Sequence, residues 1–172
     1  MKDAARIKVR LKDPGSTAYL AASLAGLAGA GDIIALHGDL GAGKTTFARG
    51  FITALLGAEE VPSPTFSLVQ TYVAENDPNV TPVWHFDLYR LEAPAEAFEL
   101  GIDEAFDQGI SLIEWPERLG PYLPKDHLQL ALGFGKGETE RVALLQGGPS
   151  WTRRLKTLAE KLPEAMLVNG ED

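Results

Sequence analysis

A glycine-rich stretch in the first third of the chain has the residue types and spacing that bind phosphate. Residues 38–46 read Gly-Asp-Leu-Gly-Ala-Gly-Lys-Thr-Thr, which fits the phosphate-loop pattern GxxxxGK[ST]. Glycine lets the backbone turn so tightly that several N–H groups point into one concavity. Lys44 adds a charge for the outer phosphates, and the Thr45 hydroxyl can bind a Mg²⁺ ion that bridges them. We therefore predict a nucleoside triphosphate site, with Mg²⁺, formed by Gly38, Asp39, Leu40, Gly41, Ala42, Gly43, Lys44, Thr45 and Thr46.

The segments before and after this stretch have the sequence patterns of a strand and a helix, the two elements that a phosphate loop connects. Residues 32–37 are a short, nearly all-apolar run, typical of a strand buried on both faces. After the loop, Phe47, Phe51 and Leu55 form an apolar stripe at helical spacing, and Gly57 fits a helix C-cap. The loop is thus predicted to join a strand to a helix whose positive end faces the phosphates.

Two carboxylates compete for the role of the acid that completes a phosphate-loop site. Glu114 follows the aliphatic run of residues 110–113, and Asp87 follows the mostly apolar run of residues 83–86. An acid at the end of a neighbouring strand can hold the magnesium shell or orient the attacking group, whereas a loop acid can simply cap a turn. The sequence favours Glu114 for the metal shell and Asp87 for a supporting or catalytic role, without settling the order.

Further polar residues follow the loop in the sequence. Ser63 and Thr65 stand in a Pro-Ser-Pro-Thr-Phe segment, which fits a loop that senses the terminal phosphate or, equally, a rigid turn that caps the next strand. If residues 85–90 are extended, His85 and Asp87 lie on one face with Tyr89. Arg90 could then pair with an acid, reach a phosphate or form a surface salt bridge.

The base of the nucleotide is indicated only weakly. The Asn/Thr-Lys-x-Asp segment of guanine-specific proteins does not occur, which favours ATP. Trp115, next to Glu114, could stack on a base, but packing at a strand end is the commoner role of such a tryptophan.

The order of predicted elements gives an α/β fold of the P-loop NTPase type, with three layers and a mixed central sheet that has helices on both faces. Two hairpins, residues 66–86 and 127–145, accompany the strand–loop–helix unit. The predicted strands are residues 7–11, 32–37, 66–74, 80–86, 109–115, 127–134 and 139–145. The predicted helices are residues 14–29, the segment from the loop to Gly57, residues 92–107 with a break near Gly101, and residues 151–162 with Arg153, Arg154 and Lys156 facing solvent.

Composition indicates a globular protein and argues against a nucleic-acid-binding, zinc-binding or membrane-spanning one. The chain has 172 residues, 45% of them hydrophobic, which predicts one globular domain over residues 1–172. The net charge of −8 argues against a stand-alone nucleic-acid binder, which needs a basic face. Cysteine is absent, and His37 and His127 have no ligand-like partners, so zinc is not expected. There is no membrane-length apolar run and no signal-like start, and we expect a cytoplasmic protein.

Four motifs taken together resemble a known family. Residues 38–47 (GDLGAGKTTF), 63–66 (SPTF), 85–90 (HFDLYR) and 113–116 (IEWP) occur in the order found in the TsaE family, small bacterial ATPases of tRNA threonylcarbamoyladenosine biosynthesis. The resemblance implies an ATPase that supports the complex modifying the adenosine next to the tRNA anticodon. It also implies a role for each matching position: phosphate binding for Lys44 and the loop backbone, Mg²⁺ binding for Thr45 and Glu114, a switch-like loop at residues 63–66, hydrolysis for Asp87, a place near the nucleotide for Trp115 and near the base for Thr17.

The same resemblance implies partners. They are threonylcarbamoyl-transferase proteins of the TsaD and TsaB type, which perform the transfer and carry the tRNA. The acidic side chains of residues 92–104 could then form a docking face, although a solvated helix surface is the commoner role of such a run. Two other functions stay open from the residues: a small-molecule kinase, although only Arg118 follows Glu114 as a lid arginine, and a non-catalytic nucleotide sensor.

Overall fold

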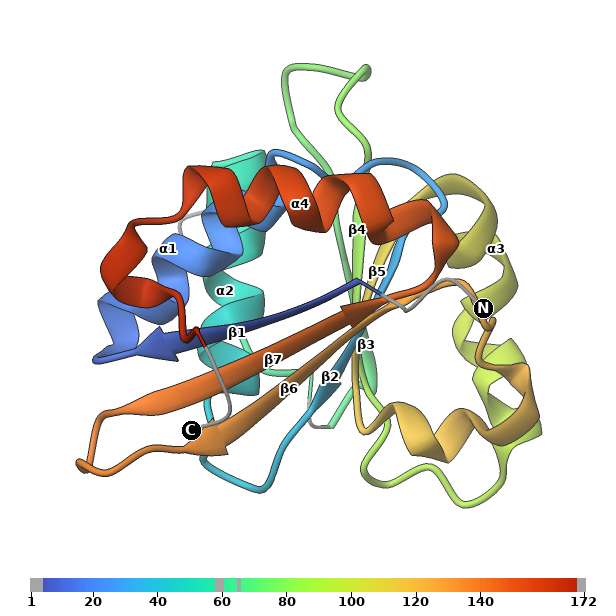
Figure 1. The fold of residues 1–172 in the computed structure, drawn as a ribbon. Helices are drawn as coiled ribbons and strands as arrows, with labels where there is room; N and C mark the ends of the chain where they lie inside the picture. The colour runs from blue at the N-terminus through green and yellow to red at the C-terminus, as the bar shows by residue number, and fades with distance from the viewer. Residues whose placement is uncertain (1–4, 58–60, 65, 170–172) are drawn as a thin grey trace.

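The computed structural model describes residues 5–57, 61–64 and 66–169, and Figure 1 shows their arrangement. The strands are β1 Arg6–Leu11, β2 Ile33–His37, β3 Val69–Tyr72, β4 Val83–Asp87, β5 Ile110–Glu114, β6 Leu128–Phe134 and β7 Arg141–Gly147. The α-helices are α1 Pro14–Ala25, α2 Lys44–Leu56, α3 Ile102–Gln108 and α4 Thr152–Lys161. Short 3₁₀ helices occupy Pro94–Leu100, Pro116–Tyr122, Pro149–Trp151 and Glu164–Met166. Among the helices of these ranges, none has the length and apolar character needed to cross a membrane.

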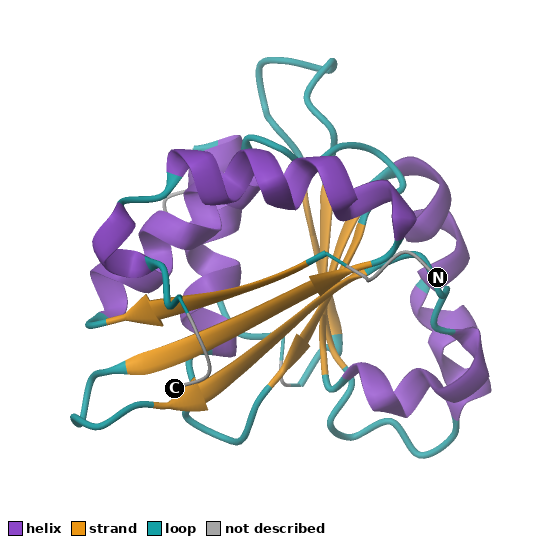
Figure 2. Cartoon of the chain, in the orientation of Figure 1, coloured by secondary structure: helices purple, strands orange, loops and turns teal. Residues whose placement is uncertain are grey.

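All seven of these strands form one sheet in the order β1-β7-β6-β2-β5-β4-β3 (Figure 2). Its centre is parallel, because β2 pairs with β5 and β6, and β5 pairs with β4, all in the same direction. Its edges are antiparallel, where β1 meets β7, β7 meets β6 and β3 meets β4. The predicted mixed α/β sheet with two hairpins is confirmed.

Helices cover the two faces of the sheet in separate groups. Side chains alternate along a strand, and successive residues of β2 accordingly enter different apolar clusters: Ile34 joins the one with α1, α2 and α4, and Ile33 the one with α3. The first cluster contains Phe47 and Phe51 of α2, and the second contains Ile102 of α3. Figure 1 shows α1, α2 and α4 on one side of the sheet and α3 on the other. This is the three-layer arrangement expected.

The ends of the elements differ from the prediction in a few places. The first helix begins as predicted, with the Asp13 side chain accepting a hydrogen bond from the Ser16 N–H at 2.8 Å, but it ends at Ala25 instead of continuing to residue 29. The strands of the first hairpin are shorter than expected. Residues 92–107 divide at Gly101 (φ 80°) into a 3₁₀ helix and α3, as their composition predicted.

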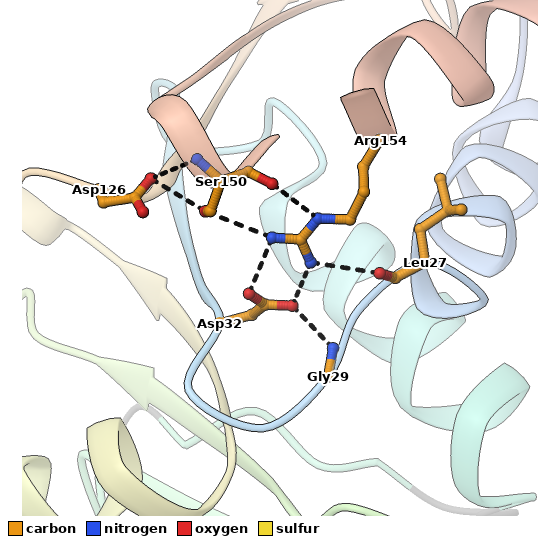
Figure 3. A network of polar contacts seen from close by, with 6 residues as sticks. All are labelled: Leu27, Gly29, Asp32, Asp126, Ser150 and Arg154. Atoms are coloured by element: carbon orange, nitrogen blue, oxygen red, sulfur yellow. Dashed lines mark hydrogen bonds and ion pairs between the residues drawn. The ribbon is translucent and has the colours of Figure 1, made fainter. Parts of the chain in front are cut away.

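One charged residue was wrongly predicted to face solvent. Arg153 and Lys156 of α4 are exposed, but the Arg154 guanidinium is mostly buried and forms an ion pair with Asp32 at the start of β2. Figure 3 shows how this arginine also donates to the Leu27 carbonyl oxygen at 3.2 Å, while Asp32 accepts from the Gly29 N–H at 2.7 Å. Hydrophobic periodicity could not reveal this pair, because Asp32 lies 122 residues away in the sequence. The contacts fix α4 to the segment that leads into β2.

We expect Asp32→Ala to lower the free energy of unfolding by about 2–3 kcal/mol, because it leaves a mostly buried guanidinium and the Gly29 N–H without their acceptor. Urea denaturation followed by circular dichroism measures this loss. Arg153→Ala, which changes an exposed cation of the same helix, is the matched control and should cost no more than about 0.5 kcal/mol. Equal losses in the two variants would contradict a stabilising role for the pair.

Candidate functional site

The glycine-rich loop leaves β2 in a turn that only glycine can make. Gly38 has φ 149°, and a Cβ atom there would lie 2.7 Å from the Leu132 carbonyl oxygen of β6. Such a contact is far inside van der Waals distance, so a larger residue would displace the loop from the sheet. Within the turn, the Ala42 N–H donates to the Asp39 carbonyl oxygen at 3.0 Å, and the Ala42 side chain is buried. Gly38, Asp39 and Ala42 thus shape the predicted loop.

The loop ends at the N-terminus of α2. Gly43 is the N-cap in the left-handed conformation (φ 106°), and no side chain caps the first turn. The backbone N–H groups at such a helix end have no partner within the helix, and the helix dipole adds partial positive charge there. The predicted strand, loop and helix are confirmed, and their geometry creates a site suited to an anion.

Lys44 is held inside this site. Its side chain is buried, and Nζ donates to the Gly38 carbonyl oxygen at 2.7 Å. The ammonium also lies 3.5 Å from the centroid of the Trp115 ring. Burial lowers the pKa of Lys44 from its ordinary value, while the Glu114 and Asp87 carboxylates oppose that shift. The lysine is therefore held by the loop at the level of the two predicted acids.

Thr45 and Glu114 provide oxygen atoms side by side. The Thr45 hydroxyl donates to Oε1 of Glu114 at 3.4 Å, and the glutamate is the buried last residue of β5. Mg²⁺ prefers oxygen ligands in octahedral geometry at 2.0–2.1 Å, which places neighbouring ligands about 3 Å apart. These two oxygens therefore fit Mg²⁺, and the residues that the sequence favoured for the metal do lie together.

Asp87 lies next to Glu114 on the adjacent strand. The two residues are aligned in the parallel ladder of β4 and β5, and each is the last residue of its strand. Asp87 is buried, and its Oδ1 accepts a hydrogen bond from the Tyr89 N–H at 3.2 Å. Asp87, the second predicted acid, thus lies beside Glu114 and has its own hydrogen-bond partner in the Tyr89 N–H.

These residues line one cleft with a volume of about 250 Å³. Its described lining consists of Leu40, Gly41, Gly43, Lys44, Thr45, Thr46, Ser63, Asp87, Glu114 and Trp115. Leu40 stands 84% exposed at the rim, where it offers apolar surface to a ligand or partner. The predicted phosphate loop, both acids and Trp115 therefore share one hollow in the surface.

Trp115 has an unusual backbone conformation. It has φ 58° and ψ 51°, in the left-handed region that a bulky residue rarely adopts. This conformation turns the chain directly after Glu114, so that the indole packs against Tyr89 (5.1 Å between ring centroids) and over the Lys44 ammonium. Backbone strain of about 1–3 kcal/mol is typical of functional sites. The sequence predicted Trp115 near the nucleotide but carried no sign of this conformation.

The segment with Ser63 and Thr65 borders the cleft in part. Ser63 lines it, whereas Thr65 lies outside the described residues. Phe66 is 86% exposed, and the Arg90 guanidinium lies 4.9 Å from the centre of its ring. Arg90 therefore stacks on an aromatic residue, and within residues 5–57, 61–64 and 66–169 it forms no ion pair.

A second hollow lies on the other side of the loop, with a volume of about 130 Å³. It shares Gly41 and Gly43 with the first cleft, and Thr17 of α1 lines it as a buried residue. Arg141 of β7 also lines it and donates to the Gly41 carbonyl oxygen at 3.2 Å. The sequence placed Thr17 near the base only through the family resemblance, and it missed Arg141, because no local pattern reports a contact between the loop and β7.

The two other histidines have local partners, and the acidic run is mostly exposed. The His127 imidazole Nδ1 contacts the Pro124 carbonyl oxygen at 2.7 Å, and His37 Nδ1 lies 3.9 Å from the Glu117 carboxylate. Burial lowers the pKa of His37. Four residues of the acidic run, Glu92, Glu99, Asp103 and Glu104, are exposed, while Glu96 caps a 3₁₀ helix by accepting from the Ala93 N–H.

Comparisons with known proteins agree with these motifs. Residues 11–142 match the family model described as threonylcarbamoyl adenosine biosynthesis protein TsaE. The tRNA threonylcarbamoyladenosine biosynthesis protein TsaE of Bacillus subtilis is 41% identical over 137 residues, 79% of this chain and 82% of that protein. The protein of that name from Rickettsia felis is 36% identical over 166 residues, 89% of this chain and 95% of its own.

A solved structure shares the fold. The crystal structure of Bacillus subtilis YdiB superposes with a TM-score of 0.75 at 31% sequence identity, covering 93% of this chain and 98% of that one. The family model spans the phosphate loop, both acids and the tryptophan beside them. The chain belongs to the TsaE family.

Proposed function

We propose that this chain hydrolyses ATP with Mg²⁺ and thereby supports the complex that makes threonylcarbamoyladenosine on tRNA. The observation that carries the proposal is the convergence of the Lys44 ammonium, the Thr45 hydroxyl and the Glu114 carboxylate at the open N-terminus of α2. Family membership adds the biosynthetic context, because the curated relatives are named for tRNA threonylcarbamoyladenosine biosynthesis.

In this proposal the chain holds the triphosphate chiefly with its main chain. The N–H groups of the loop and of the first turn of α2 bind phosphate oxygens, and Lys44 binds the outer phosphates. Thr45 and Glu114 hold Mg²⁺, which when bound neutralises charge on those phosphates. Asp87 orients the attacking water from the neighbouring strand. The hollow beside Thr17 receives the base side of the nucleotide.

Hydrolysis of this kind depends on positioning and electrostatics more than on a strong base. We propose that it is slow in the isolated chain and coupled to partners of the TsaD and TsaB type in the cytoplasm. The net charge of −8 supports a division of labour in which those partners carry the tRNA. The exposed acids of residues 92–104 are the proposed docking face for them.

Lys44→Ala tests the function directly. We expect nucleotide affinity to fall by about 10–100-fold, since a charged hydrogen bond is worth about 1.5–3 kcal/mol, and phosphate release to fall to background. Calorimetric titration with ATP and a free-phosphate assay measure the two effects. The coupling of ATP hydrolysis to the partner complex is tested by reconstituting tRNA modification with and without the chain. AMPPNP, a non-hydrolysable ATP analogue, replaces ATP in a parallel reaction. A phosphorylated small molecule instead of free phosphate would indicate a kinase, and binding without hydrolysis a sensor.

Gly38→Ala tests the shape of the loop. The added Cβ would press on the Leu132 carbonyl oxygen, so the loop must shift, and we expect ADP affinity to fall about tenfold or more. Calorimetry measures the affinity. Gly29→Ala is the matched control, because a Cβ at Gly29 has no neighbour within 4 Å among the described residues. Unchanged affinity in Gly38→Ala would argue that the ligand binds elsewhere.

The two acids should separate by their effects on the metal and on the rate. Glu114→Gln should raise the Mg²⁺ concentration needed for nucleotide binding by at least about tenfold, because it removes the charge of a proposed metal ligand itself. Asp87→Asn should leave that concentration within about twofold and lower the rate of phosphate release by about a hundredfold. Calorimetry over a series of Mg²⁺ concentrations and a single-turnover assay make the measurements. If instead Asp87→Asn raised the Mg²⁺ requirement and Glu114→Gln lowered only the rate, Asp87 would be the metal ligand and Glu114 the residue that orients water.

A further inference from the structure

The Glu114 carboxylate has a second partner that the proposed reaction does not use. Its Oε2 lies 2.7 Å from Nε2 of His85, and both side chains are almost completely buried. His85 belongs to β4 and is aligned with Leu112 of β5, so it lies on the face of the sheet to which Glu114 also points. The contact therefore joins two neighbouring parallel strands beneath the cleft.

The chemistry of the pair fixes the direction of the hydrogen bond. An ionised carboxylate only accepts hydrogen bonds, so the proton must reside on Nε2 of His85. In the neutral imidazole the other ring nitrogen, Nδ1, is then an acceptor, and it has no hydrogen-bond partner among the described residues. A buried acceptor without a partner is unfavourable. Among the described residues, the one side-chain hydrogen bond of His85 is the contact with Glu114, which orients the two side chains toward each other.

Each oxygen of Glu114 consequently has one defined task. His85 holds Oε2, and this leaves Oε1 directed toward the Thr45 hydroxyl, where the proposed Mg²⁺ would bind. Asp87, aligned beside it, accepts from the Tyr89 N–H through Oδ1, and among the described residues the Thr45 hydroxyl bonds to Glu114 and not to Asp87.

We infer that His85 is the positioning residue that makes Glu114, rather than Asp87, the metal-binding acid of this site. Partners of this kind commonly orient a metal ligand, and their loss commonly weakens metal binding by 10–100-fold. The inference rests on the proposed function and deepens it, since it names the residue that assigns the two acids their roles. His85 is completely buried and is not among the described residues that line the cleft, so in this inference it acts through Glu114.

The test compares three substitutions of His85 in the full chain. His85→Gln places an amide N–H near the position of Nε2, His85→Asn places it near Nδ1, and His85→Leu provides no donor. The measurement is the affinity for AMPPNP by calorimetry, in EDTA and over a series of Mg²⁺ concentrations. Mn²⁺ binding to the AMPPNP complex by electron paramagnetic resonance gives a second reading. Circular dichroism checks that each variant is folded.

If the inference holds, His85→Leu and His85→Asn raise the Mg²⁺ concentration for half-maximal binding about tenfold or more. AMPPNP affinity in EDTA should stay within about twofold of the unsubstituted chain, because the loop and Lys44 are untouched. His85→Gln should restore the Mg²⁺ dependence to within about threefold. A merely structural pair would lower stability without separating these two readings.

Contrary results are equally specific. Unchanged Mg²⁺ dependence in His85→Leu overturns the inference while leaving the proposed function intact. If His85→Leu does not fold, the comparison of His85→Gln with His85→Asn decides, and equal Mg²⁺ dependence in those two variants overturns it. If the unsubstituted chain binds no AMPPNP with Mg²⁺, the proposed function itself fails.

Discussion

The alignment of β2 with β5 is the constraint on which the site depends. Leu36 is aligned with Glu114 in their parallel ladder, one residue before β2 ends and shortly before the glycine-rich turn. Glu114 therefore ends its strand at the level of the loop, where its carboxylate meets the Thr45 hydroxyl from 69 residues away in the sequence. A register shift of one residue would turn Glu114 to the opposite face, toward the cluster that contains α3.

The site has local features that would let an acidic protein bind the polyanionic ligand proposed for it. Attraction comes from local groups: backbone N–H groups at the start of α2 and the Lys44 ammonium, not from the net charge of −8. Glu114 and Asp87 stand beside that ammonium, so the cleft combines one cation with two anions. Phosphates alone would meet repulsion from the acids, whereas phosphates together with a divalent cation satisfy both signs.

Features that depend on local sequence could be predicted, and features that depend on register could not. The phosphate loop, its strand and its helix follow from glycine spacing and apolar periodicity, and the break at Gly101 follows from composition. Both acids were identified because each ends an apolar run. The pairing of His85 with Glu114 and of Arg141 with Gly41 requires knowing which strands are neighbours and in what register.

Two other features show different limits of sequence reasoning. Arg154 was wrongly expected at the surface, because helical periodicity reports which side of a helix is apolar and says nothing of an ion-pair partner such as Asp32. Trp115 was expected near the nucleotide from the resemblance, but its left-handed backbone, which accompanies packing against Tyr89 and Lys44, has no signal in the local sequence. Tertiary contacts decided both outcomes.

The strand order also has a consequence for synthesis on the ribosome. The loop at residues 38–44 packs closely against β6 at Gly38. It also accepts a hydrogen bond at the Gly41 carbonyl oxygen from Arg141 of β7, which lies 100 residues downstream of Gly41. Strands β1 and β2 are translated well before their sheet neighbours β7 and β6. On the ribosome, β2 therefore stays without its partners until β5 and β6 have been synthesised and have emerged.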